Sequence, residues 1–189
     1  MNLKAKTTIL IVEDQSLIRD AIAMLLSLED DLAIAAKCSN GQEAIEYLRE
    51  YPAPSIILSD IEMPLVTGLD LAAHVTEQCL STKVVLMTTF SKPGYIKRAL
   101  SLGVKGFILK ESDSDYLIDA IHKVSAGEKV ISTELAIMAL DDNNPLSQKE
   151  MAALKHIDYK GWSAKVIDIT YPKSEGNEGL EKALTRICE

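Results

Sequence analysis

Short, uninterrupted apolar runs alternate along the chain with stretches in which apolar residues recur every three or four positions. The runs are four to six residues long and rich in Ile, Val and Leu. Runs of this kind are typical of strands that are buried on both faces. The predicted strands cover residues 7–12, 32–36, 55–60, 83–88 and 106–109.

Each predicted strand is followed by an amphipathic helical pattern. Asn40 can cap the second helix, and either Ser112 or Asp113 can cap the fifth, because short polar side chains accept hydrogen bonds from free backbone amides. Gly127 lies just past the end of the fifth helix, where glycine is favoured. The predicted helices cover residues 17–27, 41–50, 69–78, 93–103 and 113–126, with one more over 133–140.

Five rounds of strand then helix predict an α/β fold. Continuous apolar strands separated by helices indicate a parallel sheet covered on both faces, and right-handed crossovers make it doubly wound. In such folds ligands bind beyond the carboxyl ends of the strands. The candidate chemistry should therefore lie just after the strands.

The charge is distributed unevenly. Residues 1–144 hold 13 Lys/Arg and 21 Asp/Glu, whereas residues 145–189 hold seven of each. The acidic balance argues against nucleic-acid binding by the first part and leaves the second undecided. The polar segment 141–145 is the best candidate for a domain boundary.

The cysteine and histidine patterns point to no disulfide framework or zinc site. There is no C-x-x-C pair, which fits a reducing cytoplasm. The apolar run before Glu13 is too short for a signal peptide or membrane span, so we expect a soluble protein without membrane association. The cysteines are Cys38, Cys79 and Cys188, and the histidines, expected at the surface or partly buried, are His74, His122 and His156.

Acidic, hydroxyl and basic residues fall at the carboxyl ends of the predicted strands. Glu13 and Asp14 follow the first strand, and Asp60 ends the third. Thr88 ends the fourth strand, and Lys110 follows the fifth. Because these strand ends share one edge of the sheet, we expect the five side chains to converge on one cleft.

That group of residues predicts metal-dependent phosphoryl chemistry. Crowded carboxylates repel one another, and a Mg²⁺ ion with oxygen ligands resolves the conflict. Asp60 can then attack phosphorus as a nucleophile, while Lys110 and Thr88 bind phosphoryl oxygens. The backbone carbonyl of Glu62 is a further expected metal ligand.

Taken singly, these residues have other interpretations. Glu13 and Asp14 could form a solvated loop or a helix cap, and Lys110 could be a surface lysine. Asp60 with Glu62 could belong to a phosphatase of the haloacid dehalogenase type, whose signature is Asp-x-Asp. However, Glu62 replaces the second aspartate, and the acids after the first strand have no role there. No phosphate-binding loop of the ATPase type occurs.

Taken together, the residues resemble the response-regulator receiver family over about residues 7–130. The matching features are the Glu-Asp pair, Asp60-Ile-Glu-Met-Pro-Leu-Val-Thr-Gly, Leu-Met-Thr88, and Gly-Phe107-Ile-Leu-Lys110. The resemblance implies a flavodoxin-like sheet of order 2-1-3-4-5. It also implies Mg²⁺-dependent phosphorylation of Asp60 by a sensor histidine kinase, without turnover of an external substrate.

The resemblance further implies a switch. Thr88 would move toward the phosphoryl group, and Phe107 would turn inward into the space left behind. The alternative is that Phe107 is a plain core residue. The altered surface would then favour a homodimer. Within the family, the stretches Thr88-Thr-Phe-Ser-Lys-Pro-Gly-Tyr and Asn144-Pro-Leu-Ser-Gln-Lys-Glu resemble the NarL/FixJ group, and within that group a DesR-like subgroup that controls fatty-acid desaturase expression.

The C-terminal segment resembles the start of a LuxR-type helix-turn-helix. The similar stretches begin at Leu146 and Gly161. Val166 and Asp168 stand where that family has Glu and Ala, and the residues after Gly176 lack the side chains that read base edges. No DNA-binding residues can therefore be assigned, and the segment resembles a truncated or frame-shifted domain.

We therefore expect a receiver domain over 1–130, a helix and linker over 131–145, and a small all-α, altered LuxR-type segment over 146–189. Two functions remain open. One is a transcription regulator that dimerises on phosphorylation and binds promoter DNA. The other is a phosphate-accepting interaction module whose DNA-binding half is not functional.

Overall fold

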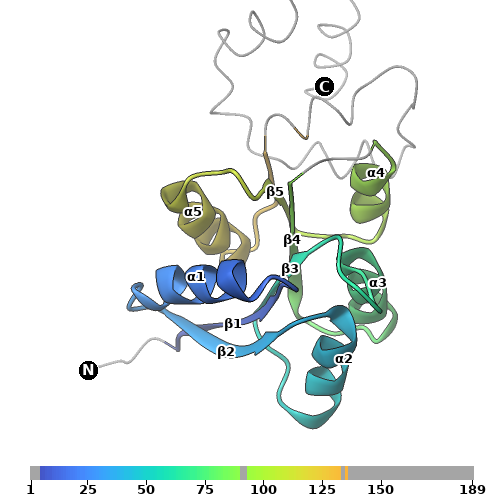
Figure 1. Cartoon of the computed structure of the whole chain (residues 1–189), viewed down its shortest axis with the longest axis horizontal. Coiled ribbons are helices and arrows are strands. Elements are labelled where there is room, and N and C mark those ends of the chain that lie inside the picture. Colours follow the sequence, from blue (N-terminus) through green and yellow to red (C-terminus); the bar gives the residue numbers. More distant parts are fainter. Residues whose placement is uncertain (1–4, 90–92, 133–134, 136–189) are drawn as a thin grey trace, which may run out of the picture.

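The computed structural model describes residues 5–89, 93–132 and 135. The predicted helix over 133–140, apart from Leu135, and the linker and C-terminal segment lie outside the described residues. The described part is a single sheet flanked by helices on both faces (Figure 1).

The sheet has six strands, all paired in parallel, in the order β2-β1-β3-β4-β5-β6. The predicted order of the first five strands is confirmed. β6 was not predicted, because two residues are too few to carry a periodicity. The strands are β1 (Thr7–Val12), β2 (Leu32–Cys38), β3 (Ile56–Asp60), β4 (Lys83–Thr88), β5 (Gly106–Leu109) and β6 (Val130–Ile131).

Five helices connect the strands, and they divide between the two faces as the doubly wound prediction requires. In Figure 1, α1 and α5 lie on one side of the sheet, and α2, α3 and α4 lie on the other. The helices are α1 (Ser16–Ser27), α2 (Gly41–Glu50), α3 (Gly68–Glu77), α4 (Pro93–Ser101) and α5 (Ser114–Ser125).

Alternating side chains of the strands form two aliphatic cores. In β1, Ile9 and Ile11 belong to the cluster under α1 and α5, whereas Leu10 and Val12 belong to the cluster under α2, α3 and α4. All four are fully buried. Burying one such side chain contributes about 1.5 to 3 kcal/mol, so the two cores hold the strand ends in place.

Side-chain caps begin two of the helices as predicted. Asn40 Oδ1 accepts a hydrogen bond from Glu43 N at 3.0 Å. Of the two residues proposed for α5, Asp113 is the cap, since its Oδ1 accepts from Tyr116 N at 2.8 Å. The N-cap of α1 is Gln15, which makes no side-chain cap hydrogen bond.

The two described cysteines differ in their environment. Cys38 is buried and Cys79 is exposed, and both are free thiols. Burial, with a smaller contribution from the nearby Glu43 carboxylate, raises the pKa of the Cys38 thiol to about 11. Within the described ranges, no helix has the length and apolarity needed to cross a membrane.

Candidate functional site

Four neighbouring parallel strands deliver polar side chains to one edge of the sheet. Asp60 at the end of β3 pairs with Met87 of β4, and Thr88 at the end of β4 pairs with Leu109 of β5. Lys110 therefore follows directly beside Thr88, and its backbone amide donates to Thr88 O at 2.8 Å.

Lys110 joins the acids of two different strands. Its Nζ lies 2.7 Å from Glu13 Oε2 and 2.9 Å from Asp60 Oδ2. The three side chains are 8%, 0% and 8% exposed, so these ion pairs are sheltered from water. Residues that are up to 97 positions apart thus meet around a single ammonium group.

Asp14 completes a group of three carboxylates. Ligand oxygens of Glu13, Asp14 and Asp60 all lie within 4.8 Å of one another. Asp14 is exposed, while Glu13 and Asp60 are buried. Because Gln15 is the N-cap of α1 and uses no side-chain bond, the helix-cap interpretation of Asp14 does not hold.

The donor set fits a hard divalent cation. Glu13 Oε2 accepts no well-aligned hydrogen bond within the described part of the chain, although Lys110 Nζ lies close to it. Three carboxylates whose ligand oxygens lie within 4.8 Å of one another carry more negative charge than the single Lys110 ammonium balances, and a bound cation would balance the remainder. Carboxylate oxygens with water are the ligands that Mg²⁺ prefers.

The local electrostatics reflect this crowding. Burial raises the pKa of the Glu13 carboxyl above its ordinary value; Lys110 opposes that shift and the Asp60 charge adds to it. For Lys110, burial lowers the pKa, but the ion pairs with the Glu13 and Asp60 carboxylates outweigh that effect, and the net pKa is raised. One ammonium therefore stays charged between two acids that repel each other.

The backbone around Asp60 is held by neighbours that the sequence analysis did not single out. Ser59 Oγ donates to Asp60 O at 2.8 Å, and Ile61 N donates to Asp60 Oδ1 at 2.7 Å. Gly68 packs so closely that a Cβ on it would lie 2.1 Å from Asp60 O. Gly68 is the last residue of the Asp60 motif and so carried a signal in the sequence, but Ser59 offered none.

The remaining predicted residues lie around this cluster. Thr88 is buried, and Phe107 is 2% exposed within the core under α4. Burial of Phe107 fits a plain core residue, and its role in the switch stays a prediction. Glu62 lies in the turn after β3, where its Oε1 accepts from Tyr95 Oη at 2.9 Å. The role of the Glu62 carbonyl as a metal ligand stays a prediction.

The loop after Asp60 carries one strained residue. Leu65 has a φ of 66° and is 82% exposed. Residues other than glycine rarely adopt this left-handed conformation, and it recurs at functional sites. The loop thus presents an exposed apolar side chain, which no periodicity in the sequence could indicate.

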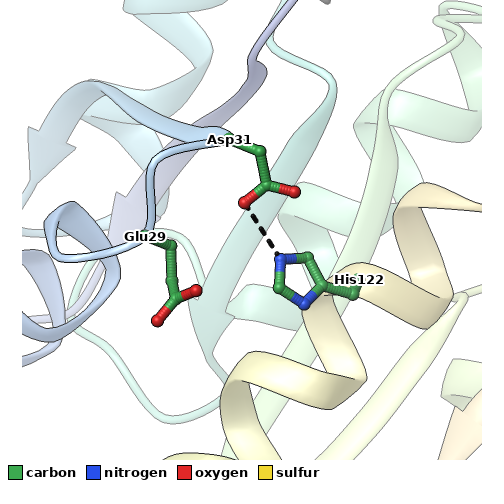
Figure 2. A group of neighbouring side chains, drawn as sticks. All are labelled: Glu29, Asp31 and His122. Atoms are coloured by element: carbon green, nitrogen blue, oxygen red, sulfur yellow. Dashed lines mark hydrogen bonds and ion pairs between the residues drawn. The ribbon is translucent and has the colours of Figure 1, made fainter.

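A second group of potential ligands lies at the amino ends of the strands, the edge opposite to the site. Figure 2 shows His122 of α5 pointing toward Asp31, with Nε2 3.2 Å from Asp31 Oδ1, and Glu29 beside them. The two paired side chains are 38% and 62% exposed. An exposed pair of this kind contributes about 0 to 1 kcal/mol and needs no metal. The expectation of a partly buried histidine holds for His122.

Comparisons with known proteins agree on one family. The family model described as "Response regulator receiver domain" matches residues 9–122. The transcriptional regulatory protein DesR of Bacillus subtilis is 37% identical over 148 residues, which cover 78% of this chain and 73% of that protein. The uncharacterized transcriptional regulatory protein YvfU of the same organism is 37% identical over 145 residues, covering 77% of this chain and 72% of the relative.

Solved structures agree as well. The crystal structure of a DNA-binding response regulator of the LuxR family from Staphylococcus aureus matches with a TM-score of 0.60 and 38% identity, covering 63% of this chain and 98% of that chain. The signal receiver domain of a response regulator, NarL, from Mycobacterium tuberculosis matches with a TM-score of 0.63 and 27% identity, covering 66% of this chain and all of that one.

Proposed function

The chain belongs to the response regulator receiver family, and from that premise we propose that Mg²⁺-dependent phosphorylation of Asp60 is its central reaction. As a two-component response regulator it has a sensor kinase as its partner, and it is not a conventional enzyme. The observation that carries the proposal is the Lys110 ammonium between Glu13 and Asp60, next to a third carboxylate.

In the proposed reaction, separate groups hold the cation, attack phosphorus and bind the phosphoryl oxygens. Glu13, Asp14, Asp60 and the Glu62 carbonyl would hold the cation, which neutralises charge on the incoming phosphoryl group when bound. An Asp60 carboxylate oxygen forms the bond to phosphorus as the bond to the donor's leaving group breaks. Lys110 binds one phosphoryl oxygen by charge. Such transfer depends mainly on positioning and electrostatics.

Thr88 and Phe107 are the residues proposed for the switch. Thr88 lies beside Lys110 and would donate its hydroxyl to a phosphoryl oxygen. A movement of Thr88 toward the phosphoryl group, followed by Phe107 of the neighbouring strand, would then couple phosphorylation to the face formed by β4, α4 and β5. Moving such an equilibrium from mostly one state to mostly the other needs roughly 5 kcal/mol of differential interaction.

Removing the cation should stop phosphorylation. With acetyl phosphate as donor, the phosphorylated fraction, measured on a phosphate-affinity gel, should fall below detection in excess EDTA. It should return when MgCl₂ is added in excess of the chelator. Equal labelling with and without EDTA would contradict the proposed site.

The exposed face of α1 is a candidate surface for binding a partner. Leu17, Met24 and Leu28 are 83%, 70% and 75% exposed, and their spacing of seven and four places them on one side of the helix. Large apolar side chains gathered on one face mark an interaction site more often than scattered ones do. We assign this face, rather than the face formed by β4, α4 and β5, to the contact between two copies of the chain in the homodimer.

A charge on that face should weaken the dimer. Met24→Glu places a carboxylate among apolar residues, and burying it on association should raise the dimer dissociation constant of the phosphorylated protein about tenfold or more. Sedimentation equilibrium measures this. Tyr51→Glu is the control, because Tyr51 is also exposed and apolar but lies just past α2. Equal effects of both substitutions would contradict the assignment.

We further propose that the phosphorylated protein regulates transcription. It is supported by the names of similar proteins, DesR among them, and by the LuxR-like residues after position 145. The second candidate, an interaction module without DNA binding, is favoured by the balanced charge of residues 145–189. A gel-shift assay with phosphorylated protein at stated salt decides between them. Either function would be exerted in the cytoplasm, where family members act.

A further inference from the structure

The turn between β1 and α1 carries two of the three carboxylates, and Arg19 holds its backbone from the helix side. Arg19 Nη1 donates to Glu13 O at 2.6 Å and lies 3.5 Å from Asp14 O. The carbonyls that it contacts belong to the two acids themselves. From the strand side, Glu13 N donates to Cys38 O at 3.1 Å.

The start of α1 has little else to fix this turn. Gln15 makes no side-chain cap, and the first turn of the helix contains no acidic residue. Gln15 N does approach Glu13 Oε1, but at 3.3 Å this contact uses an oxygen of a proposed ligand. Without the guanidinium, the backbone of this turn would be anchored mainly by the Glu13 N bond to β2, although Lys110 would still hold the Glu13 carboxylate.

We propose that Arg19 is a positioning residue for the divalent cation, which keeps the Glu13 and Asp14 carboxylates in place before the ion arrives. The inference rests on the proposed function, because it concerns the same site. Groups that orient metal ligands commonly change metal affinity by 10- to 100-fold. Both contacts come from Nη1, so lysine could replace them in part, but its ammonium is a point donor on a flexible stem and is less well oriented than the planar guanidinium.

Two effects of Arg19 have opposite signs, which makes the inference testable. The guanidinium is a positive charge close to a cation site, so Coulomb repulsion alone predicts that its removal tightens Mg²⁺ binding. Positioning predicts that its removal weakens binding. The direction of the change in the dissociation constant therefore identifies the effect that prevails.

The experiment is a MgCl₂ titration of the full chain, followed by backbone amide chemical shifts, together with acetyl phosphate labelling over the same Mg²⁺ range. Arg19→Ala should raise the Mg²⁺ dissociation constant about tenfold, and Arg19→Lys should raise it less. The labelling rate at saturating Mg²⁺ should stay within about twofold of wild type. Arg49→Ala, which removes the same charge at the far end of α2, should leave the dissociation constant unchanged.

The outcomes separate the two proposals. If wild-type protein binds no Mg²⁺ or is not labelled, the proposed function fails. If the wild type behaves as expected but Arg19→Ala binds Mg²⁺ equally well or more tightly, the positioning role is overturned. A slower rate at saturating Mg²⁺ with an unchanged dissociation constant overturns it too. Should Arg19→Ala not fold, Arg19→Met keeps the aliphatic stem without the donors and is judged by the same criteria.

Discussion

Asp60→Asn should abolish phosphorylation while leaving the protein folded. The amide has nearly the same shape as the carboxylate, and its oxygen can still accept the Ile61 N hydrogen bond, which is 2.7 Å long in the native protein. The amide is not a competent nucleophile toward phosphorus, and the substitution removes one of the acids proposed to hold the cation. Labelling by acetyl phosphate in saturating Mg²⁺ should fall below detection on a phosphate-affinity gel.

The control for this variant is Asp119→Asn. Asp119 is an exposed acid of α5 that pairs with Lys123 at 3.0 Å, so its loss changes net charge equally without touching the site. Labelling of the control should stay within about twofold of wild type. If Asp60→Asn were labelled like the control, another residue would have to be the phosphoacceptor. Circular dichroism of both variants checks that the fold is kept.

The sequence predicts the strand ends well because parallel strands leave little freedom. Once an apolar run is identified as a strand, its carboxyl end lies at the same edge as the others. The placement of Glu13, Asp60 and Lys110 near one another therefore follows from topology. What the pattern could not show is how they share charge, with one ammonium within 3 Å of two acids.

Other features depend on single contacts rather than on periodic patterns. β6 has two residues, and the Arg19 contact with Glu13 O depends on the direction of one side chain. Ser59 gives no chemical signal in the sequence, because a serine in a strand has many uses. Leu65 adopts the left-handed conformation, which residues with a Cβ rarely do, so its conformational propensity predicts a negative φ there.

Gly68→Ala should have the largest effect on stability. Gly68 is the first residue of α3, and replacing glycine by alanine at a sterically compatible position normally stabilises a protein by about 0.4 to 1 kcal/mol, because alanine lowers the entropy of the unfolded chain. Here its Cβ would lie 2.1 Å from Asp60 O and 3.0 Å from Ser59 Oγ, so backbone must move. Overpacking of this severity costs about 3 kcal/mol, which outweighs that stabilisation. Urea denaturation should show that loss in the free energy of unfolding.

Gly94→Ala is the matched control, because a Cβ at Gly94 in α4 meets nothing within 4 Å. There the stabilisation by alanine acts alone, and the free energy of unfolding should rise by about 0.4 to 1 kcal/mol. Replacing glycine by alanine should thus lower the free energy of unfolding at Gly68 and raise it at Gly94. The proximity of Gly68 to Asp60 explains the difference. Since the shift at Gly68 moves the Asp60 backbone, acetyl phosphate labelling of the folded fraction should also slow. Equal stability of both variants would mean that the close approach to Asp60 costs nothing.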